Sequence, residues 1–165
     1  FTFMVSMGLA QAGSIRVSNA FGRKDWPKLT IIGRSTIITA LIYGIICAVA
    51  FVLLKNILPK AFNDNPEVLA LTSILILYAA IFQISDSTQA ISAGLLRGIK
   101  DVKVPTLLIG VAYWVIGIPL GYTLAFHLKM GAVGMWVGLI TGLTFASLFL
   151  IARFHKMTKE NAHLK

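Results

Sequence analysis

Five long apolar stretches, separated by short polar segments, make up most of this chain of 165 residues. Each is close to the roughly 20 residues that an α-helix needs to cross about 30 Å of hydrocarbon. Apolar and polar residues do not alternate along them, as they would along the strands of a membrane barrel. The pattern therefore predicts an all-α polytopic membrane bundle of about five transmembrane helices, with spans at about 1–20, 29–54, 67–96, 104–128 and 131–152.

The composition supports a membrane protein. Hydrophobic residues form 57% of the chain and charged residues only 13%, whereas about a quarter of the residues of a soluble domain are charged. The chain also begins with Phe1, inside an apolar stretch, and shows neither the charged start nor the cleavage site of a signal peptide. We therefore expect it to be a piece of a longer protein.

The positions of the basic residues predict an orientation. Twelve of the fifteen Lys and Arg residues lie near the first and third connections or in the C-terminal tail, which ends at Lys165. Only Lys55, Lys60 and Lys129 lie near the second and fourth connections. Because Lys and Arg favour the cytoplasmic side, we expect the C-terminus to be cytoplasmic and the protein to lie in the cell (inner) membrane. The formal net charge of +9 then indicates contact with the lipid bilayer and not with nucleic acid.

Asp86 is the only acidic residue between Val68 and Leu96. A charged group at mid-bilayer costs roughly 2.5–3.5 kcal/mol on insertion scales, and such groups usually face a bundle interior or an aqueous cavity. At about 100° per residue, Phe82, Gln83 and Gln89 lie within about 60° of Asp86 on a helical wheel. The opposite face is bulky and aliphatic, so we expect the Asp86 face to line a cavity.

A carboxylate in such a cavity can hold a proton and a cation in turn, as an antiporter requires. Gln83 and Gln89 can supply carbonyl oxygens to a metal ion, and Phe82 can stack against an organic cation. These residues form the candidate site for cations and substrates, with Asp86 as a possible Na⁺ ligand. The alternative is that hydroxyl or amide groups hold Asp86 only to fix helix packing.

An enzyme is not expected. Membrane hydrolases and transferases need paired carboxylates, a metal cluster or a nucleophile with its base. Asp86 has no His or second acid beside it in the interior of the apolar stretches, since Glu67 and His127 lie at the ends of theirs. No cofactor is expected either, and the only ion that we predict is a coupling Na⁺ or H⁺.

Two further features concern how the helices pack. Pro119 lies inside the fourth stretch, where its missing N–H predicts a kink that acts either as a hinge or as a static bend. Gly134, Gly138 and Gly142 recur every four residues in the last stretch. This small-xxx-small pattern is typical of close contacts between membrane helices.

Five strings of residues, in this order, resemble the C-terminal half of MATE-family multidrug exporters, especially the NorM-like branch. The likeness runs from about Phe3 to Arg153. The strings are RVSNAFG at 16–22, FQISDSTQ at 82–89, GLLRGIKD at 94–101, YWVIGIPLGY at 113–122 and GAVGMW at 131–136.

The resemblance implies that residues 1–165 are part of the C-terminal six-helix lobe of a twelve-helix transporter, from the end of its eighth helix onward. The family exports organic-cation drugs in exchange for Na⁺ or H⁺ by alternating access. Asp86 matches the acid of the tenth helix implicated in cation binding, and Phe82 stands where related members often have a tyrosine. The seventh-helix glutamate and the N-terminal lobe would precede Phe1, so we expect no transport by this chain alone.

Two other functions stay open. A flippase of the same superfamily would move a lipid-linked precursor, although its phosphates favour basic residues in a central cavity and the candidate here is acidic. A truncated gene would yield a membrane fragment that does not transport. This alternative concerns whether the chain can transport, and it is compatible with descent from the same superfamily.

Overall fold

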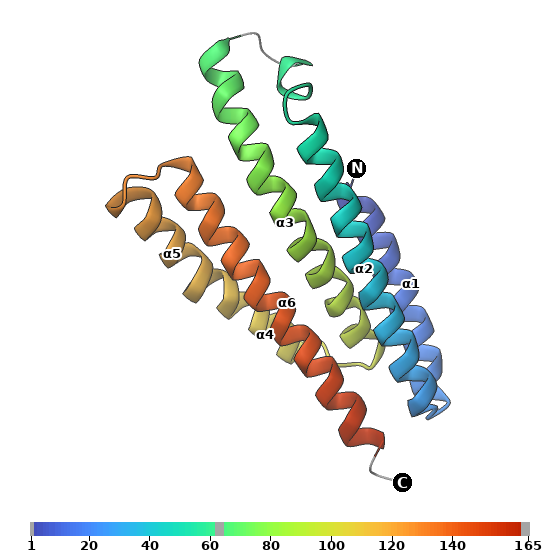
Figure 1. The fold of residues 1–165 in the computed structure, drawn as a ribbon. Coiled ribbons are helices and arrows are strands. Elements are labelled where there is room, and N and C mark those ends of the chain that lie inside the picture. The colour runs from blue at the N-terminus through green and yellow to red at the C-terminus, as the bar shows by residue number, and fades with distance from the viewer. Residues whose placement is uncertain (1, 62–64, 163–165) are drawn as a thin grey trace.

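A computed structural model describes residues 2–61 and 65–162, and these ranges contain helices and no strand. Phe1, where the first predicted span begins, and Lys165 of the basic tail lie outside the described residues. The all-α prediction is confirmed, and the long helices lie side by side (Figure 1). The helices are α1 (Thr2–Gly22), α2 (Trp26–Leu54), η1 (Pro59–Ala61), α3 (Pro66–Gly98), α4 (Lys103–Val111), η2 (Ala112–Gly117), α5 (Ile118–Tyr122), η3 (Thr123–His127) and α6 (Ala132–Ala162).

Four helical segments of the described chain are long and apolar enough to cross a membrane. They are α2, α3, the continuous helix Lys103–His127 that α4, η2, α5 and η3 form together, and α6 as far as Glu160. The first predicted span is the helix α1, which has 21 residues and packs against α2 and α3. Several polar residues interrupt its apolar character, among them Gln11, Arg16 and Asn19.

Two helix boundaries differ from the predicted spans. The helix α2 begins at Trp26 and not near 29, because the Asp25 side chain caps it by accepting a hydrogen bond from the Lys28 N–H at 3.1 Å. At the other end of the chain, α6 continues to Ala162, well beyond 152. No Pro or Gly follows Gly142 to end it, so the helix extends into the charged tail.

The two ends of the bundle differ in charge. The α1–α2 connection, the α3–α4 connection and the C-terminal end of α6 all lie at one end (Figure 1). Most of the basic residues belong to these segments or to the adjoining ends of the helices, whereas Lys55, Lys60 and Lys129 lie at the opposite end. An ion pair stabilises the basic end, because Arg153 Nε of α6 lies 2.7 Å from Asp101 Oδ2 of the α3–α4 connection.

The glycines of α6 allow close contact with the helix Lys103–His127, as the sequence predicted. A Cβ added at Gly142 would lie 2.9 Å from the Ala112 carbonyl oxygen and 3.1 Å from Gly117 Cα. One added at Gly134 would lie 2.5 Å from the Ala125 nitrogen. At Gly138 an added Cβ would overlap the backbone of the facing helix. The two backbones therefore touch along the glycine stripe.

The facing helix meets this stripe with its own buried small residues, Ala112, Gly117, Gly121 and Ala125. Their spacing is five residues and then four and four. A step of five would turn an α-helix about 140° past one full turn, but η2 is π-helical over Ala112–Gly117, and a π-turn closes over five residues. The π-helical segment thus keeps Ala112 on the face that meets α6.

The central helix α3 packs against α1, α2 and α6. Its glycines also meet backbone, since a Cβ at Gly94 would lie 2.7 Å from the Ala10 carbonyl oxygen and one at Gly98 would lie 2.6 Å from that of Ser14. Large side chains fill the space between α1, α2, α3 and α6 at the basic half of the bundle, including Val17, Leu29, Ile91, Leu95, Leu96, Leu150 and Phe154.

Substituting Gly138→Ala is expected to destabilise the bundle, because the new methyl group meets the backbone of Gly121 and backbone cannot move aside cheaply. Overpacking of this kind costs about 1–3 kcal/mol. The thermal unfolding midpoint in detergent micelles should therefore fall. Gly110→Ala is the matched control, since a Cβ there has no neighbour within 4 Å and should leave the midpoint unchanged or raise it slightly. Equal midpoints for the two variants would contradict the close contact.

Candidate functional site

Asp86 lies on α3, partly buried, where α3 meets α6. One turn earlier, the Phe82 ring packs edge-on against Trp136 of α6, with centroids 5.7 Å apart and an interplanar angle of 80°. Beside it, the hydroxyl groups of Ser85 and Thr144 are 2.9 Å apart and share a hydrogen bond. Both contacts with α6 therefore lie within about one helical turn before Asp86 on α3.

Tyr113, on a third helix, lies within electrostatic range of Asp86. Tyr113 belongs to η2, and π-helical turns within α-helices are frequent at functional sites. In the parts of the chain that the structure describes, no side chain donates a hydrogen bond to Asp86 or pairs with it as an ion. Whether Asp86 binds an ion or only fixes helix packing stays open.

The structure divides the other predicted residues between two interfaces. Gln83 is 5% exposed, and its Oε1 accepts a hydrogen bond from the Thr2 hydroxyl of α1 at 3.3 Å. Its Nε2 has no hydrogen-bond partner among the described residues. Tyr43 of α2 joins the same group by donating to the Thr2 carbonyl oxygen at 2.9 Å. Gln83 thus faces α1 and α2, whereas Phe82 faces α6.

Gln89 is partly buried on α3, three residues after Asp86. It also lies seven residues after Phe82, about two helical turns, which places it on the same side of the helix as Phe82. Of the predicted set, Asp86, Phe82 and Gln89 therefore share the side of α3 that is nearest α6. Their roles in binding cations and substrates stay predictions.

The arrangement combines one negative charge with aromatic rings. No group of three or more His, Cys, Asp or Glu side chains that could hold a metal ion occurs within the described ranges. A carboxylate beside Phe82, Trp136 and Tyr113 can attract a single positive charge, and aromatic faces attract organic cations in addition.

Pro119 lies within a continuous helix, at the start of α5. The π-helical segments η2 and η3 flank it on both sides, and the Ile118 N–H donates to the Tyr113 carbonyl oxygen, five residues back. Such local π geometry re-satisfies backbone groups that a proline leaves without partners. The hinge role of Pro119 stays a prediction.

Sequence reasoning did not assign Tyr113, Trp136 or Thr144 to the site. Each lies in a different part of the chain from Asp86, so only the packing of α6 and η2 brings them near it. For Tyr113 and Trp136 the sequence did contain a signal, which is a polar aromatic residue inside an apolar span. Tyr and Trp in such places usually have a partner for their polar atoms.

Residues 1–123 of the chain match the MatE family. The chain is 40% identical over 169 residues to the probable multidrug resistance protein NorM of Agrobacterium fabrum, an alignment that covers 96% of this chain and 35% of that protein. It is 35% identical over 162 residues to the multidrug resistance protein MdtK of Photorhabdus laumondii, with the same coverage of 96% and 35%. The chain thus spans about a third of the length of these relatives.

Two solved structures share the fold. The eukaryotic MATE transporter AtDTX14 superposes with a TM-score of 0.86 at 21% identity, over 97% of this chain and 37% of that one. An inward-facing MATE family transporter of the MOP superfamily gives a TM-score of 0.87 at 14% identity, over 98% and 38%. At these identities the likeness concerns the arrangement of the helices.

The ring contact between Phe82 and Trp136 should couple α3 to α6 energetically. We expect the destabilisation by Phe82→Leu and by Trp136→Leu to be non-additive, with a coupling of about 0.5–1.5 kcal/mol, which is typical of aromatic pairs. Unfolding free energies of the two single variants and the double variant measure it. Trp114 is 74% exposed, so Trp114→Leu combined with Phe82→Leu serves as the additive control. Additivity in both cycles would rule out the contact.

Proposed function

This chain belongs to the MatE family, and we propose that it forms part of a transporter that exports organic cations in exchange for Na⁺ or H⁺. The transport would be non-enzymatic and would use Asp86 as the intramembrane carboxylate. The names of the NorM and MdtK relatives, both multidrug resistance proteins, support drugs as the substrates.

One observation carries the proposal: Asp86 is a partly buried acid within a membrane span, with no hydrogen bond or ion pair from the described residues. An intramembrane acid that neighbouring groups do not neutralise is available to an ion or a substrate. Phe82, Trp136 and Tyr113 provide the aromatic surroundings that favour an organic cation. Gln89 lies on the same side of α3 and offers a carbonyl oxygen.

The proposed mechanism needs a second lobe. Secondary transporters bind their substrates near the bilayer midplane between two repeats, which rock around the site. Asp86 supplies one charge on one wall of such a site, and an N-terminal lobe would supply the opposite wall. We further propose that the basic end of the bundle lies in the cytoplasm, in the inner membrane, in accord with the positive-inside rule.

Replacing Asp86→Asn should abolish coupled efflux, because the amide keeps the size of the side chain but neither titrates nor carries the negative charge that attracts a cation. The measurement is efflux of a fluorescent organic cation from cells that express the protein at its full encoded length, with Na⁺ and proton gradients imposed separately. We expect at least a tenfold loss at an unchanged membrane level. The gradient that drives the unsubstituted protein identifies the coupling ion.

Glu67→Gln is the matched control, since Glu67 is an exposed acid in the first turn of the same helix. It should retain efflux. Normal pumping by Asp86→Asn would assign Asp86 to helix packing and remove the basis of the proposal. Transport of a lipid-linked precursor in place of organic cations would instead favour the flippase.

If Pro119 acts as a hinge, Pro119→Ala should slow transport without weakening substrate binding. The substitution supplies the missing N–H, so it favours regular helix over the π-helical turns on both sides. Efflux rate and binding affinity for the same organic cation, measured on purified protein, separate the two effects. Pro105→Ala is the control, because Pro105 lies in the first turn of α4, where an N–H has no helical acceptor. An unchanged efflux rate for Pro119→Ala would identify a static bend.

A further inference from the structure

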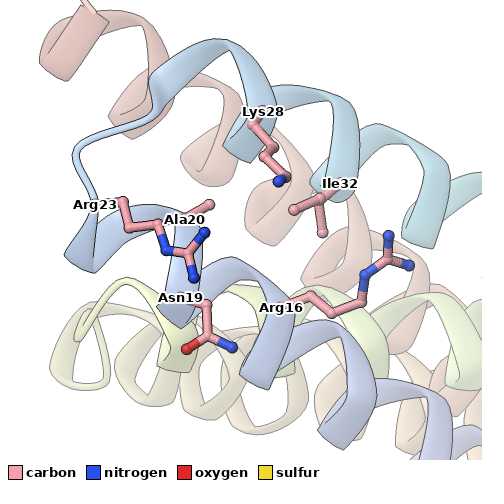
Figure 2. Close-up of a pocket in the computed structure, with 6 residues that line it drawn as sticks. All are labelled: Arg16, Asn19, Ala20, Arg23, Lys28 and Ile32. Carbon is pink, nitrogen blue, oxygen red and sulfur yellow. The ribbon is translucent and has the colours of Figure 1, made fainter.

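A basic pocket opens between α1 and α2 at the end of the bundle that carries most of the Lys and Arg residues. Its volume is about 300 Å³. Figure 2 shows Arg23 and Lys28 extending toward the space between the two helices, with Arg16 bordering it from the other side. The lining residues are Arg16, Asn19, Ala20, Arg23, Lys28 and Ile32.

The charge of this pocket is not balanced by the residues around it. Three of its six lining residues are cationic and none is acidic. Within the described ranges, none of the three cations forms an ion pair. The nearest acid along the chain, Asp25, uses its side chain to cap α2 at the Lys28 N–H. Three cationic side chains and Asn19 therefore line a space large enough for a phosphate group.

The surroundings of the pocket are apolar on the membrane side. Ile15 and Ile31, each adjacent in sequence to a lining residue, are 58% and 68% exposed. The helix α2 continues from the pocket as a membrane span with exposed aliphatic side chains, among them Ile38, Ile42, Ile45 and Ile46. A ligand with an anionic head and apolar chains fits both parts, because basic pockets between membrane helices bind anionic head groups.

We propose that this pocket binds the phosphate of an anionic phospholipid, with Arg16, Arg23 and Lys28 contacting the head group and the acyl chains lying along α2. This function is independent of transport and of Asp86. A free phosphate ion shares the head-group chemistry but lacks the contact with the aliphatic residues of α2. The lipid is therefore the favoured source of the phosphate.

The test compares lipid binding by the protein at its full encoded length. Purified protein in zwitterionic phosphatidylcholine is titrated with phosphatidylglycerol, and the thermal unfolding midpoint and the apparent affinity are recorded. We expect stabilisation by phosphatidylglycerol, and we expect the double variant Arg23→Gln/Lys28→Gln to lose affinity about tenfold or more. Its midpoint in phosphatidylcholine alone verifies that it folds, and Arg16→Gln provides an independent variant with a smaller loss.

Arg97→Gln/Lys103→Gln is the matched control. It removes the same two residue types from exposed positions at the same end of the bundle, outside this pocket. Equal losses in the two double variants would overturn the proposal, because binding would then depend on diffuse charge. Equal stabilisation by inorganic phosphate at matched ionic strength would also overturn it, in favour of a site for a soluble anion. Retained affinity in the pocket variant would overturn it as well, because the head group would then bind somewhere other than this pocket.

Discussion

Direct contact between helix backbones is the interaction on which the arrangement of this bundle depends. In hydrocarbon, apolar side chains gain little by moving from lipid to a neighbouring helix, so association relies on close packing at small residues. The glycines of α6 meet Ala112, Gly117 and Gly121 of the adjoining helix, while Gly94 and Gly98 bring α3 against α1. Each of these interfaces fixes where a helix lies relative to its neighbours, and therefore which side chains can meet.

The surroundings of Asp86 follow from that packing. With α6 held against the helix Lys103–His127, one face of α6 remains for α3, and Trp136 and Thr144 lie on it. The same contact brings Tyr113 within electrostatic range of Asp86. The π-helical turn at η2 therefore has two effects. It aligns the small residues of this helix with the glycines of α6, and it sets the position of Tyr113.

The sequence predicted those features that depend on a single helix. Apolar length located the four helices that are long and apolar enough to cross a membrane, and the glycine period located a packing face on α6. A helical wheel gives the angle between Gln83 and Asp86 but not the helix that each side chain meets, so it placed Gln83 in the site although Gln83 contacts α1. The π-helical turns could not be predicted from the sequence either, since they depend on the register between two helices. The extension of α6 to Ala162 reflects the lack of any helix-ending residue after the apolar stretch.

The distribution of charge along α3 relates the depth of Asp86 to the basic end of the bundle. Twelve residues separate Asp86 from Gly98, the last residue of α3, which is about 18 Å at a rise of 1.5 Å per residue. Half the thickness of the hydrocarbon layer is about 15 Å. If Arg97 and the nearby cations remain at the head groups, Asp86 must lie near the midplane, where secondary transporters bind their substrates. The cations at one end of the bundle would thus fix the depth in the membrane at which the single acid of α3 lies.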